Sequence, residues 1–482
     1  MDRRGTSEHA TPRFAQKMDY DVLIIGSGPA GQHAAWQASR MGKRAAIIER
    51  KPKIGGAGLQ TGTIPSKAMR EVAYLLSRSS AGGMRQALSP GGVNRHGLLA
   101  DAVRRKEVVI AQQESVILQR LLRSGVALIP GEAAFLDAHT IQVTDAAGKL
   151  RKISAEAIVL ATGSRPRRPA DVPFDKKTVL DSTSILNLRH LPDSLTVVGG
   201  GVIACEFVSI FAALGVRVSV VDSHAQLLTY LSEDVVGVLA DSFLGMGVTF
   251  HMQERVAEIR RDGNGTLTVL ESGKQVQSDA VLYAQGRQPN SEKLHVEQAG
   301  IAAEDGWIAV NQHFQTSVPH IFAVGDLIGR PALASTGMEQ GRAAVLYAFE
   351  GERHVTAENL PMAVYTIPEI SYVGKTEKEV QQENIPYVVG RAYFKDSARG
   401  QIIGDAQGML KLVVDARNEK LLGVHIVGEQ ASELVHIGQL VMNLNGTVRD
   451  LVSNVFNYPT LAECYKLAAL DCTHRLEQQK NP

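Results

Sequence analysis

The stretch that decides the fold is DYDVLIIGSGPAGQHAAWQASRMGKRAAIIER, residues 19–50. A short apolar run rich in Val and Ile is followed by a glycine-rich turn, a helical pattern and a second apolar run. Such runs are typical of parallel strands that are covered on both faces. The stretch therefore predicts a strand, a tight turn, a helix and a second strand, which is the unit that binds dinucleotides.

The same unit occurs a second time as SLTVVGGGVIACEFVSIFAALGVRVSVVDS, residues 194–223. In the first copy Gly26 allows the tight turn, Gly28 lets the backbone approach a pyrophosphate, and Gly31 lets the helix pack close to the strand. The phosphates then lie on the N-terminal amides of the helix. The corresponding positions of the second copy are Gly199, Gly201 and Ala204.

An acidic residue closes each copy. Glu49 and Asp222 both lie 23 residues after the first glycine of their unit. An acid at this place accepts hydrogen bonds from ribose hydroxyls. One glycine pattern alone would also suit an unrelated turn, but two complete copies with matched acids predict a protein that binds two dinucleotides.

Further strand patterns that end in glycine indicate how the two units are nested. Residues 155–164 form a strand pattern that ends at Thr162 and Gly163, and residues 279–290 form a similar one that ends at Gly286. The second unit lies between them. We therefore predict an α/β fold with two Rossmann-like domains, the second inserted in the first.

The rest of the chain predicts a third part. Residues 316–326 give another strand pattern, ending in Gly325 and Asp326, and a helical pattern covers 335–349. From about residue 361 the pattern changes to antiparallel strands with flanking helices and no phosphate loop, which favours an α+β module. The predicted division is an extension at 1–18, a first dinucleotide-binding domain at 19–157 and 287–360, a second at 158–286, and a C-terminal module at 361–482.

Composition excludes several classes of function. The 482 residues carry a net charge of +1, so neither nucleic acid nor a membrane surface is an expected partner. No apolar run is long enough to span a bilayer, and residues 1–18 read as a disordered extension because they lack the apolar core of a signal peptide. Cys205, Cys464 and Cys472 are the three cysteines. Their number and spacing favour neither disulfides nor a metal site, which suits a reducing, cytoplasmic compartment.

With these motifs assembled, the chain resembles the flavoprotein family of glutathione reductase and dihydrolipoamide dehydrogenase, from about residue 19 to the C-terminus. GSGPAG with Glu49 resembles that family's FAD fingerprint, and ATG at 161–163 and TSVPHIFAVGD at 316–326 resemble two further flavin-associated motifs. The resemblance implies FAD, a nicotinamide cofactor, and a homodimer or higher homo-oligomer built through the C-terminal module. It also implies that Asp326 hydrogen-bonds the ribityl chain of the flavin.

The redox sulfurs of the reductases in this family are missing here. Those enzymes carry two cysteines, with four residues between them, in the stretch that reads GGAGLQTGTIPSKAM at 55–69; the two positions are Gly58 and Thr63. Their C-terminal histidine corresponds to Tyr458, and their glutamate to Glu463. The resemblance implies that this pair approaches the flavin of the partner subunit, with dimer packing as the alternative. The chain resembles the branch that exchanges hydride between NADPH and NAD with flavin alone.

The resemblance also implies a charged pair beside the flavin. Lys67 matches the family lysine at the flavin and Glu206 its ion-pair partner, early on the helix of the second unit. A positive charge there would stabilise the reduced, anionic flavin. Without the resemblance, an exposed lysine and an exposed glutamate would be the simpler interpretation.

The end of the second unit leaves the nucleotide preference open. Binding of NADP(H) usually uses an Arg near this strand end, whereas Asp222 would repel a 2′-phosphate and His224 helps only when protonated. An NADH-dependent diaphorase or quinone reductase is therefore the alternative to hydride exchange between NADP(H) and NAD(H). A catalytically idle flavoprotein used as an interaction module is a third hypothesis. Thiol substrates are disfavoured because the cysteines are missing.

Overall fold

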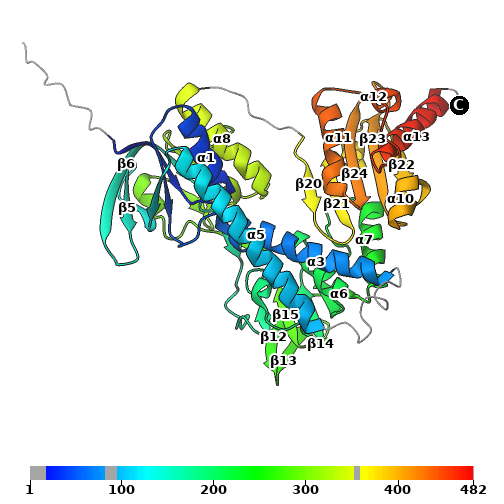
Figure 1. Ribbon diagram of the computed structural model, residues 1–482, viewed down its shortest axis with the longest axis horizontal. Helices are drawn as coiled ribbons and strands as arrows, with labels where there is room; N and C mark the ends of the chain where they lie inside the picture. Colours follow the sequence, from blue (N-terminus) through cyan, green and yellow to red (C-terminus); the bar gives the residue numbers. More distant parts are fainter. Residues whose placement is uncertain (1–17, 82–94, 352–358, 481–482) are drawn as a thin grey trace, which may run out of the picture.

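The structure is a computed structural model that describes residues 18–81, 95–351 and 359–480. Figure 1 shows three lobes: one with the N-terminal sheet and helices α1 and α8, one with β12–β15 and α6, and one with the C-terminal sheet and α11–α13. The long helices α3 (Thr63–Ala81) and α5 (Arg95–Arg123) connect the first lobe with the second. Residues 1–17 of the predicted extension lie outside the described residues.

The first lobe is built on a mainly parallel sheet around β1. Its order among the described residues is β3-β2-β1-β6-β5-β4, with β19 also paired to β6. Ile24 of β1 lies opposite Ile47 of β2 and Val159 of β6, and all three side chains are buried. The strands are β1 (Tyr20–Ile25), β2 (Ala45–Glu49), β3 (Ala127–Pro130), β4 (Glu132–Phe135), β5 (Thr140–Thr144), β6 (Leu150–Leu160) and β19 (Ile321–Ala323).

Two helices pack side by side on one face of this sheet. They are α1 (Pro29–Arg40) and α8 (Ala334–Glu350), the helix predicted at 335–349. A Cβ at Gly341 of α8 would lie 2.1 Å from the carbonyl oxygen of Ala30 of α1. The helices therefore approach at a point where only glycine fits, which places the middle of α8 against the first turn of α1.

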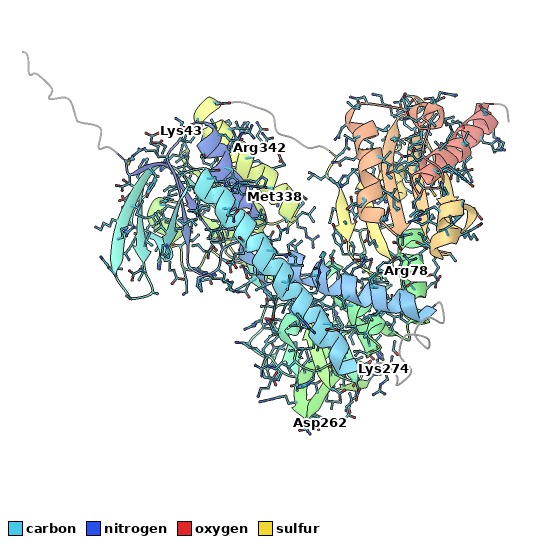
Figure 2. All side chains as sticks on the ribbon, viewed as in Figure 1. Lys43, Arg78, Asp262, Lys274, Met338 and Arg342 are labelled. Carbon is cyan, nitrogen blue, oxygen red and sulfur yellow. The ribbon has the colours of Figure 1, made fainter. Side chains whose placement is uncertain are left out.

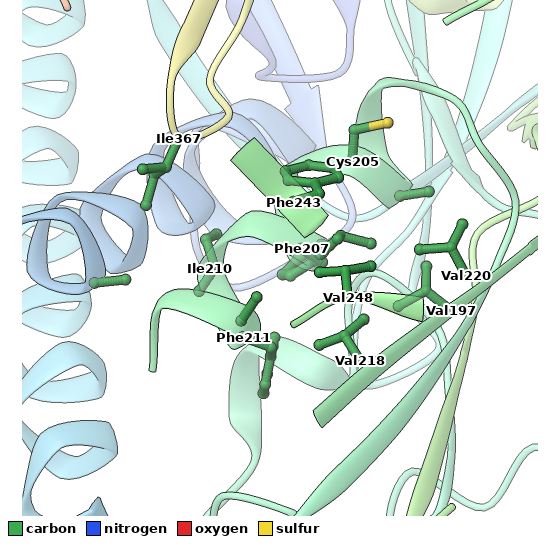
Figure 3. Packing of buried hydrophobic residues seen from close by; sticks show 14 of the residues in the cluster. Val197, Cys205, Phe207, Ile210, Phe211, Val218, Val220, Phe243, Val248 and Ile367 are labelled. Atoms are coloured by element: carbon green, nitrogen blue, oxygen red, sulfur yellow. The ribbon is translucent and has the colours of Figure 1, made fainter. Parts of the chain in front are cut away.

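The second lobe has the predicted second unit as its centre. In the described residues its parallel sheet has the order β11-β10-β9-β15-β8, and Val197 of β9 lies opposite Val220 of β10. Figure 3 shows Val197, Val218 and Val220 packed with Phe243 in the core of this lobe. The elements are β8 (Val179–Leu180), β9 (Ser194–Val198), α6 (Val202–Ala213), β10 (Arg217–Asp222), α7 (Glu233–Gly245), β11 (Thr249–Met252), β12 (Val256–Asp262), β13 (Gly265–Leu270), β14 (Gln275–Ser278) and β15 (Ala280–Tyr283).

The chain crosses between the two lobes at a small antiparallel pair, β7 (Ser164–Pro166) with β16 (Arg287–Pro289). The predicted boundary between 157 and 158 falls inside β6, which pairs with β1 and β19 as far as Leu160. A strand paired along its length belongs to one sheet. We therefore propose that the first domain extends to Leu160 and that the crossing pair marks the division.

The C-terminal lobe is the predicted α+β module. Its antiparallel sheet has the order β20-β21-β24-β23-β22 among the described residues. The elements are β20 (Met362–Val364), β21 (Glu369–Gly374), α9 (Glu377–Gln382), β22 (Tyr387–Tyr393), α10 (Ala398–Ile403), β23 (Met409–Asp415), β24 (Leu421–Gly428), α11 (Ala431–Asn443), α12 (Val448–Ser453) and α13 (Glu463–Lys480). The predicted fold class, two Rossmann-like domains and a C-terminal α+β module, is confirmed.

Side chains from the other lobes hold this module in place. Figure 2 shows Arg78 near the end of α3, beside the C-terminal lobe. Its guanidinium lies 3.0 Å from the Glu429 carboxylate and donates to the Ile403 carbonyl oxygen at 2.7 Å. Ile370 and Val427 of the C-terminal sheet belong to the same hydrophobic cluster as the core of the second lobe. The C-terminal module is thus packed directly against the second unit.

Candidate active site

The first glycine turn has a geometry that requires glycine. Gly26 has a φ of +109°, and a Cβ there would lie 2.4 Å from the Ala161 carbonyl oxygen. A Cβ at Gly31 would lie 2.0 Å from the carbonyl oxygen of Gly26. Gly28 precedes the first residue of α1 in extended conformation, and the first amides of a helix have no partner within it, so this helix start can hold an anion.

Glu49 ends β2 beside this turn. Its Oε2 atom accepts hydrogen bonds from the Ser27 amide at 3.0 Å and the Ser27 hydroxyl at 2.6 Å, and its Oε1 atom accepts one from the Lys51 amide at 2.9 Å. The carboxylate is therefore held at the carboxyl end of the strand, next to the first glycine turn. Its contact with a ribose stays a prediction.

A pocket of about 700 Å³ runs from this turn to helix α6 of the second lobe. That volume lies within the usual range for cofactor sites. The pocket brings together nine of the predicted site residues: Gly26, Gly28, Glu49, Lys67, Thr162, Gly163, Glu206, Gly325 and Asp326. The predicted residues that do not line it are Gly31, Gly199, Gly201, Asp222, Gly286, Tyr458 and Glu463.

The residues of the pocket fit a flavin dinucleotide. The Thr162 hydroxyl is buried at the pocket and has no hydrogen-bond partner among the described residues, so it is available to a ligand. The amides at the start of α1 suit a pyrophosphate, and the start of α8 with Ala334 and Ser335 lines another part of the pocket. A helix N-terminus stabilises negative charge on a group that is bound there.

Lys67 and Glu206 form a close ion pair in this pocket. The Lys67 Nζ atom lies 2.7 Å from both carboxylate oxygens of Glu206. Lys67 comes from the second turn of α3, and Glu206 comes from the first half of α6. The lysine side chain is 25% exposed and the glutamate side chain 6%, so the buried acid holds a cation that still faces the pocket. The structure thus shows the ion pair, and its position beside a flavin stays a prediction.

Asp326 takes part in a polar cluster at the crossing between the lobes. Its Oδ2 atom accepts a hydrogen bond from the Ser164 hydroxyl at 2.7 Å and lies 3.7 Å from the Nε atom of Arg287. Burial lowers the pKa of Arg287, while Asp326 acts in the opposite direction. The sequence analysis named Gly286 but not Arg287. Arg287 could have been found as a charged residue that directly follows a buried strand and its glycine.

The second glycine turn repeats the first on the other sheet. Gly199 has a φ of +120°, and a Cβ there would lie 3.0 Å from the Ala284 carbonyl oxygen. Gly201 precedes α6, and Ala204 is fully buried. Gly286, with a φ of +89°, follows β15 at the same edge of this sheet. This edge lies at the carboxyl ends of the strands, where nucleotides bind in open α/β sheets.

Asp222 and His224 are joined by hydrogen bonds at the end of β10. The Asp222 Oδ1 atom accepts a hydrogen bond from the His224 amide at 2.8 Å and lies 2.7 Å from the His224 Nδ1 atom. The aspartate side chain is 10% exposed and the histidine side chain 63%. The imidazole of His224 is thus hydrogen-bonded to the Asp222 carboxylate.

The positions of the missing sulfurs lie on the pocket. Gly58 is in α2 (Gly56–Gln60) and Thr63 begins α3, and both line the pocket. The three cysteines are elsewhere, and all are buried and free. Burial raises the pKa of Cys464 to about 11 and that of Cys472 to about 12, so neither thiol is prepared for redox chemistry.

Tyr458 and Glu463 lie in the C-terminal module and do not line the pocket of their own chain. Tyr458 is 72% exposed, and Val455 close by is 93% exposed. Exposed apolar side chains near one another suit a protein interface. Their contact with a partner subunit stays a prediction.

A search against family models matches two parts of the chain. Residues 20–341 match the pyridine nucleotide-disulphide oxidoreductase family, and residues 360–469 match the dimerisation domain of that family. The chain belongs to this family and is an oxidoreductase. Membership implies a flavin and a nicotinamide nucleotide, and the dimerisation domain indicates a homo-oligomer.

Similar proteins with assigned names indicate the kind of oxidoreductase. The chain is 45% identical to the soluble pyridine nucleotide transhydrogenase of Mycobacterium tuberculosis (strain ATCC 25177 / H37Ra) over 95% of its length and 98% of the relative. It is 41% identical to the protein of the same name from Pseudomonas putida (strain W619), over 95% and 99% of the two chains.

Solved structures give the same fold. The chain is similar to LpdA from Mycobacterium tuberculosis with a TM-score of 0.86 and 29% identity, covering 93% of this chain and 98% of that one. The HOCl-induced flavoprotein disulfide reductase RclA from Escherichia coli matches with a TM-score of 0.83 and 27% identity, covering 94% and 99%. In the described ranges, no helix is both long and apolar enough to cross a membrane, and no three His, Cys, Asp or Glu side chains gather as a metal site.

Proposed function

We propose that this protein transfers hydride between NADPH and NAD+ with FAD as its bound cofactor and no redox-active disulfide. The observation that carries the proposal is the Lys67–Glu206 pair, which lies where the first glycine unit and the helix of the second meet. Support comes from the relatives named soluble pyridine nucleotide transhydrogenase at 41% and 45% identity. It also comes from the residues at the two cysteine positions, Gly58 and Thr63.

The residues of the first unit would hold FAD. Gly26, Gly28 and Gly31 shape a turn that would accept the pyrophosphate, and Glu49 would bind the adenosine ribose. The residues that would hold the flavin end are Thr162, Gly163, Gly325 and Asp326. When bound, the flavin supplies the hydride acceptor and donor of the reaction. Lys67 contributes a fixed positive charge near the reacting centre, where it stabilises developing negative charge, and Glu206 keeps the lysine in place.

The second unit would bind the nicotinamide nucleotides one after the other. Gly199 and Gly201 form its phosphate turn, and Gly286 lies at the neighbouring strand end. Glu206 sits on the helix that starts at this turn, so a nicotinamide ring and a flavin would meet near the Lys67–Glu206 pair. A thiol relay is unnecessary because donor and acceptor both react at the flavin.

One observation favours a second candidate, an NADH-dependent diaphorase or quinone reductase. The Asp222 carboxylate is nearly buried, and it would accept hydrogen bonds from the two ribose hydroxyls of NAD(H) and repel a 2′-phosphate. No arginine stands at 222–226, and His224 is drawn toward Asp222. In this candidate the flavin step is the same and the final acceptor differs.

An acceptor comparison separates the two candidates. The FAD-loaded homodimer is assayed with NADPH or NADH as donor and with either a thionicotinamide analogue of NAD+ or a benzoquinone as acceptor. Our proposal predicts turnover for NADPH with the NAD+ analogue. Turnover with quinone alone, and only from NADH, would instead establish the diaphorase.

A further inference from the structure

The Lys67–Glu206 pair has a third member from the C-terminal module. The backbone amide of Tyr365 donates a hydrogen bond to the Oε1 atom of Glu206 at 3.1 Å. The Lys67 Nζ atom lies over the aromatic ring of Tyr365, 4.8 Å from its centroid. Tyr365 follows β20 directly and lines the same pocket. One residue therefore contacts both members of the ion pair.

Each of these two contacts stabilises one member of the Lys67–Glu206 pair. The Glu206 carboxylate is nearly buried, and a buried carboxylate must be supplied with hydrogen-bond donors. The Tyr365 amide adds one donor to those of Lys67. The ammonium of a partly exposed lysine can adopt many rotamers, and an aromatic face at this distance holds it by a cation–π interaction. Together the carboxylate and the ring keep the charge directed at the pocket.

The backbone that carries Tyr365 is itself fixed by three helices. The Tyr365 amide bonds to Glu206 of α6, the Thr366 carbonyl oxygen accepts from the Arg70 guanidinium of α3 at 3.0 Å, and the Ile367 carbonyl oxygen accepts from the Ser242 hydroxyl of α7 at 3.3 Å. Figure 3 shows Ile367 next to the core of the second lobe, to whose hydrophobic cluster it belongs.

Arg70 strengthens this attachment. It lies three residues after Lys67 on α3, is buried, and also pairs with Glu369 of β21 at 3.2 Å. The segment 365–367 is therefore attached to the helix that carries the lysine and to the helix that carries the glutamate. A ring that is placed this rigidly can fix the position of a flexible side chain.

We propose that Tyr365 is a positioning residue of the hydride-transfer site: its ring holds the Lys67 ammonium in the pocket and its amide orients Glu206. The proposal rests on the proposed function, because it assigns Lys67 its role at a bound flavin. It gives the C-terminal module a part in the chemistry of its own chain, besides its part in dimerisation. Loss of the ring would leave the Lys67 ammonium held by Glu206 alone and would weaken the positive potential at the flavin.

The test compares variants of the FAD-loaded homodimer. Tyr365→Leu removes the ring and keeps the backbone amide, Tyr365→Met does the same with a larger flexible side chain, and Tyr365→Phe restores the ring. Tyr372→Leu is the matched control, because its ring belongs to the same module and packs near His425 and Tyr230. The main readout is the midpoint potential of the flavin, measured with a chemical reductant and a reference dye, without any nicotinamide nucleotide.

We expect a more negative flavin potential in Tyr365→Leu and Tyr365→Met, return toward the wild-type value in Tyr365→Phe, and no change in Tyr372→Leu. The rate of flavin reduction at saturating nucleotide should fall about tenfold in the first two variants, because the charge at the flavin is less well placed. A folded, FAD-containing Tyr365→Leu or Tyr365→Met protein with the wild-type potential would overturn the proposal.

This outcome is separate from the fate of the proposed function. If NADPH fails to reduce the wild-type flavin, the transhydrogenase proposal is wrong, whereas the potentials still show whether Tyr365 places the lysine. If NADPH reduces it normally and the potentials of the variants match the wild type, the function stands and the role of Tyr365 is refuted.

Discussion

The Lys67 ammonium and the Glu206 carboxylate lie 2.7 Å apart although 139 residues separate them along the chain. Lys67 stands on α3, which begins at Thr63 within the stretch that lacks cysteines, and Glu206 stands on the helix after the second glycine turn. The contact therefore joins the predicted flavin unit to the predicted nicotinamide unit at one charged point. We propose that this charged point lies beside the bound flavin, where a positive charge would stabilise the reduced form.

Removal of the Lys67 charge should slow reduction of the flavin and leave FAD bound. A lone Lys67→Ala change would leave the buried Glu206 carboxylate unpaired, which is itself costly, so Lys67→Met combined with Glu206→Gln is the cleaner variant. We expect the rate of flavin reduction in stopped-flow absorbance to fall about tenfold to a hundredfold.

Lys43→Met is the control for this variant. This lysine lies over the Phe349 ring on the far side of the first lobe, and Figure 2 shows it away from the second lobe. It should reduce at the wild-type rate. A double variant that binds FAD and is reduced as fast as Lys43→Met would contradict the role of the pair.

The choice between nucleotides should depend on Asp222 and His224. Asp222→Asn removes the charge that repels a 2′-phosphate, and His224→Arg supplies a permanent cation that the carboxylate no longer engages. We expect the double variant to raise the ratio of kcat/KM for NADPH to that for NADH by about tenfold or more. Steady-state assays with both donors measure this ratio, and an unchanged ratio would show that the 2′-phosphate is recognised elsewhere.

The three thiols should not react with thiol reagents in the native protein. Burial raises the pKa of all three, to about 11 for Cys464 and about 12 for Cys472, and Cys205 shifts in the same direction. An aromatic disulfide reagent at pH 8 should therefore release almost no chromophore from the folded protein and three equivalents in denaturant. A rapidly reacting thiol whose modification stops flavin reduction would overturn a mechanism without sulfur.

Stability should decline in mild acid partly because of His425. This histidine is fully buried in the C-terminal module, where burial lowers its pKa to about 4. Lys411 adds to the lowering, whereas Asp234 and Glu377 oppose it. The unfolded chain takes up a proton near pH 6.5 and the folded chain does not, so stability is full above that pH and is lost as pH falls toward 4.

The loss due to this one group should reach about 3 kcal/mol at pH 4. Denaturant unfolding of the wild type and of His425→Gln between pH 7 and pH 4 measures it, since glutamine keeps a donor for the Lys375 carbonyl oxygen and does not titrate. If both proteins lose stability with the same slope, His425 is not the source.

Much of the fold could be predicted because glycine positions have a steric cause. Gly26 and Gly199 have positive φ angles and lie close to a neighbouring strand, so each position requires glycine. This requirement is visible in the sequence as a glycine pattern at both turns. The Lys67–Glu206 contact was accessible only through the family resemblance, since nothing local to either residue indicates the other.

The contacts that were missed are those set by packing between distant segments. Arg287 reaches Ser164 across the crossing between the lobes, and Tyr365 reaches Lys67 and Glu206 from the C-terminal module. The sequence around Arg287 and Tyr365 contains no motif that indicates which residues they contact. The predicted domain boundary between 157 and 158 falls inside β6, because an apolar run gives no sign of which sheet pairs with it.

The most direct test of the account is a single anaerobic turnover. The FAD-loaded protein is mixed with one equivalent of NADPH and then with a thionicotinamide analogue of NAD+. We predict that NADPH bleaches the flavin absorbance and that the analogue restores it while one equivalent of reduced analogue appears. A flavin that NADPH leaves oxidised, or a reduced flavin that the analogue does not re-oxidise, would contradict hydride transfer between the two nucleotides at a sulfur-free site.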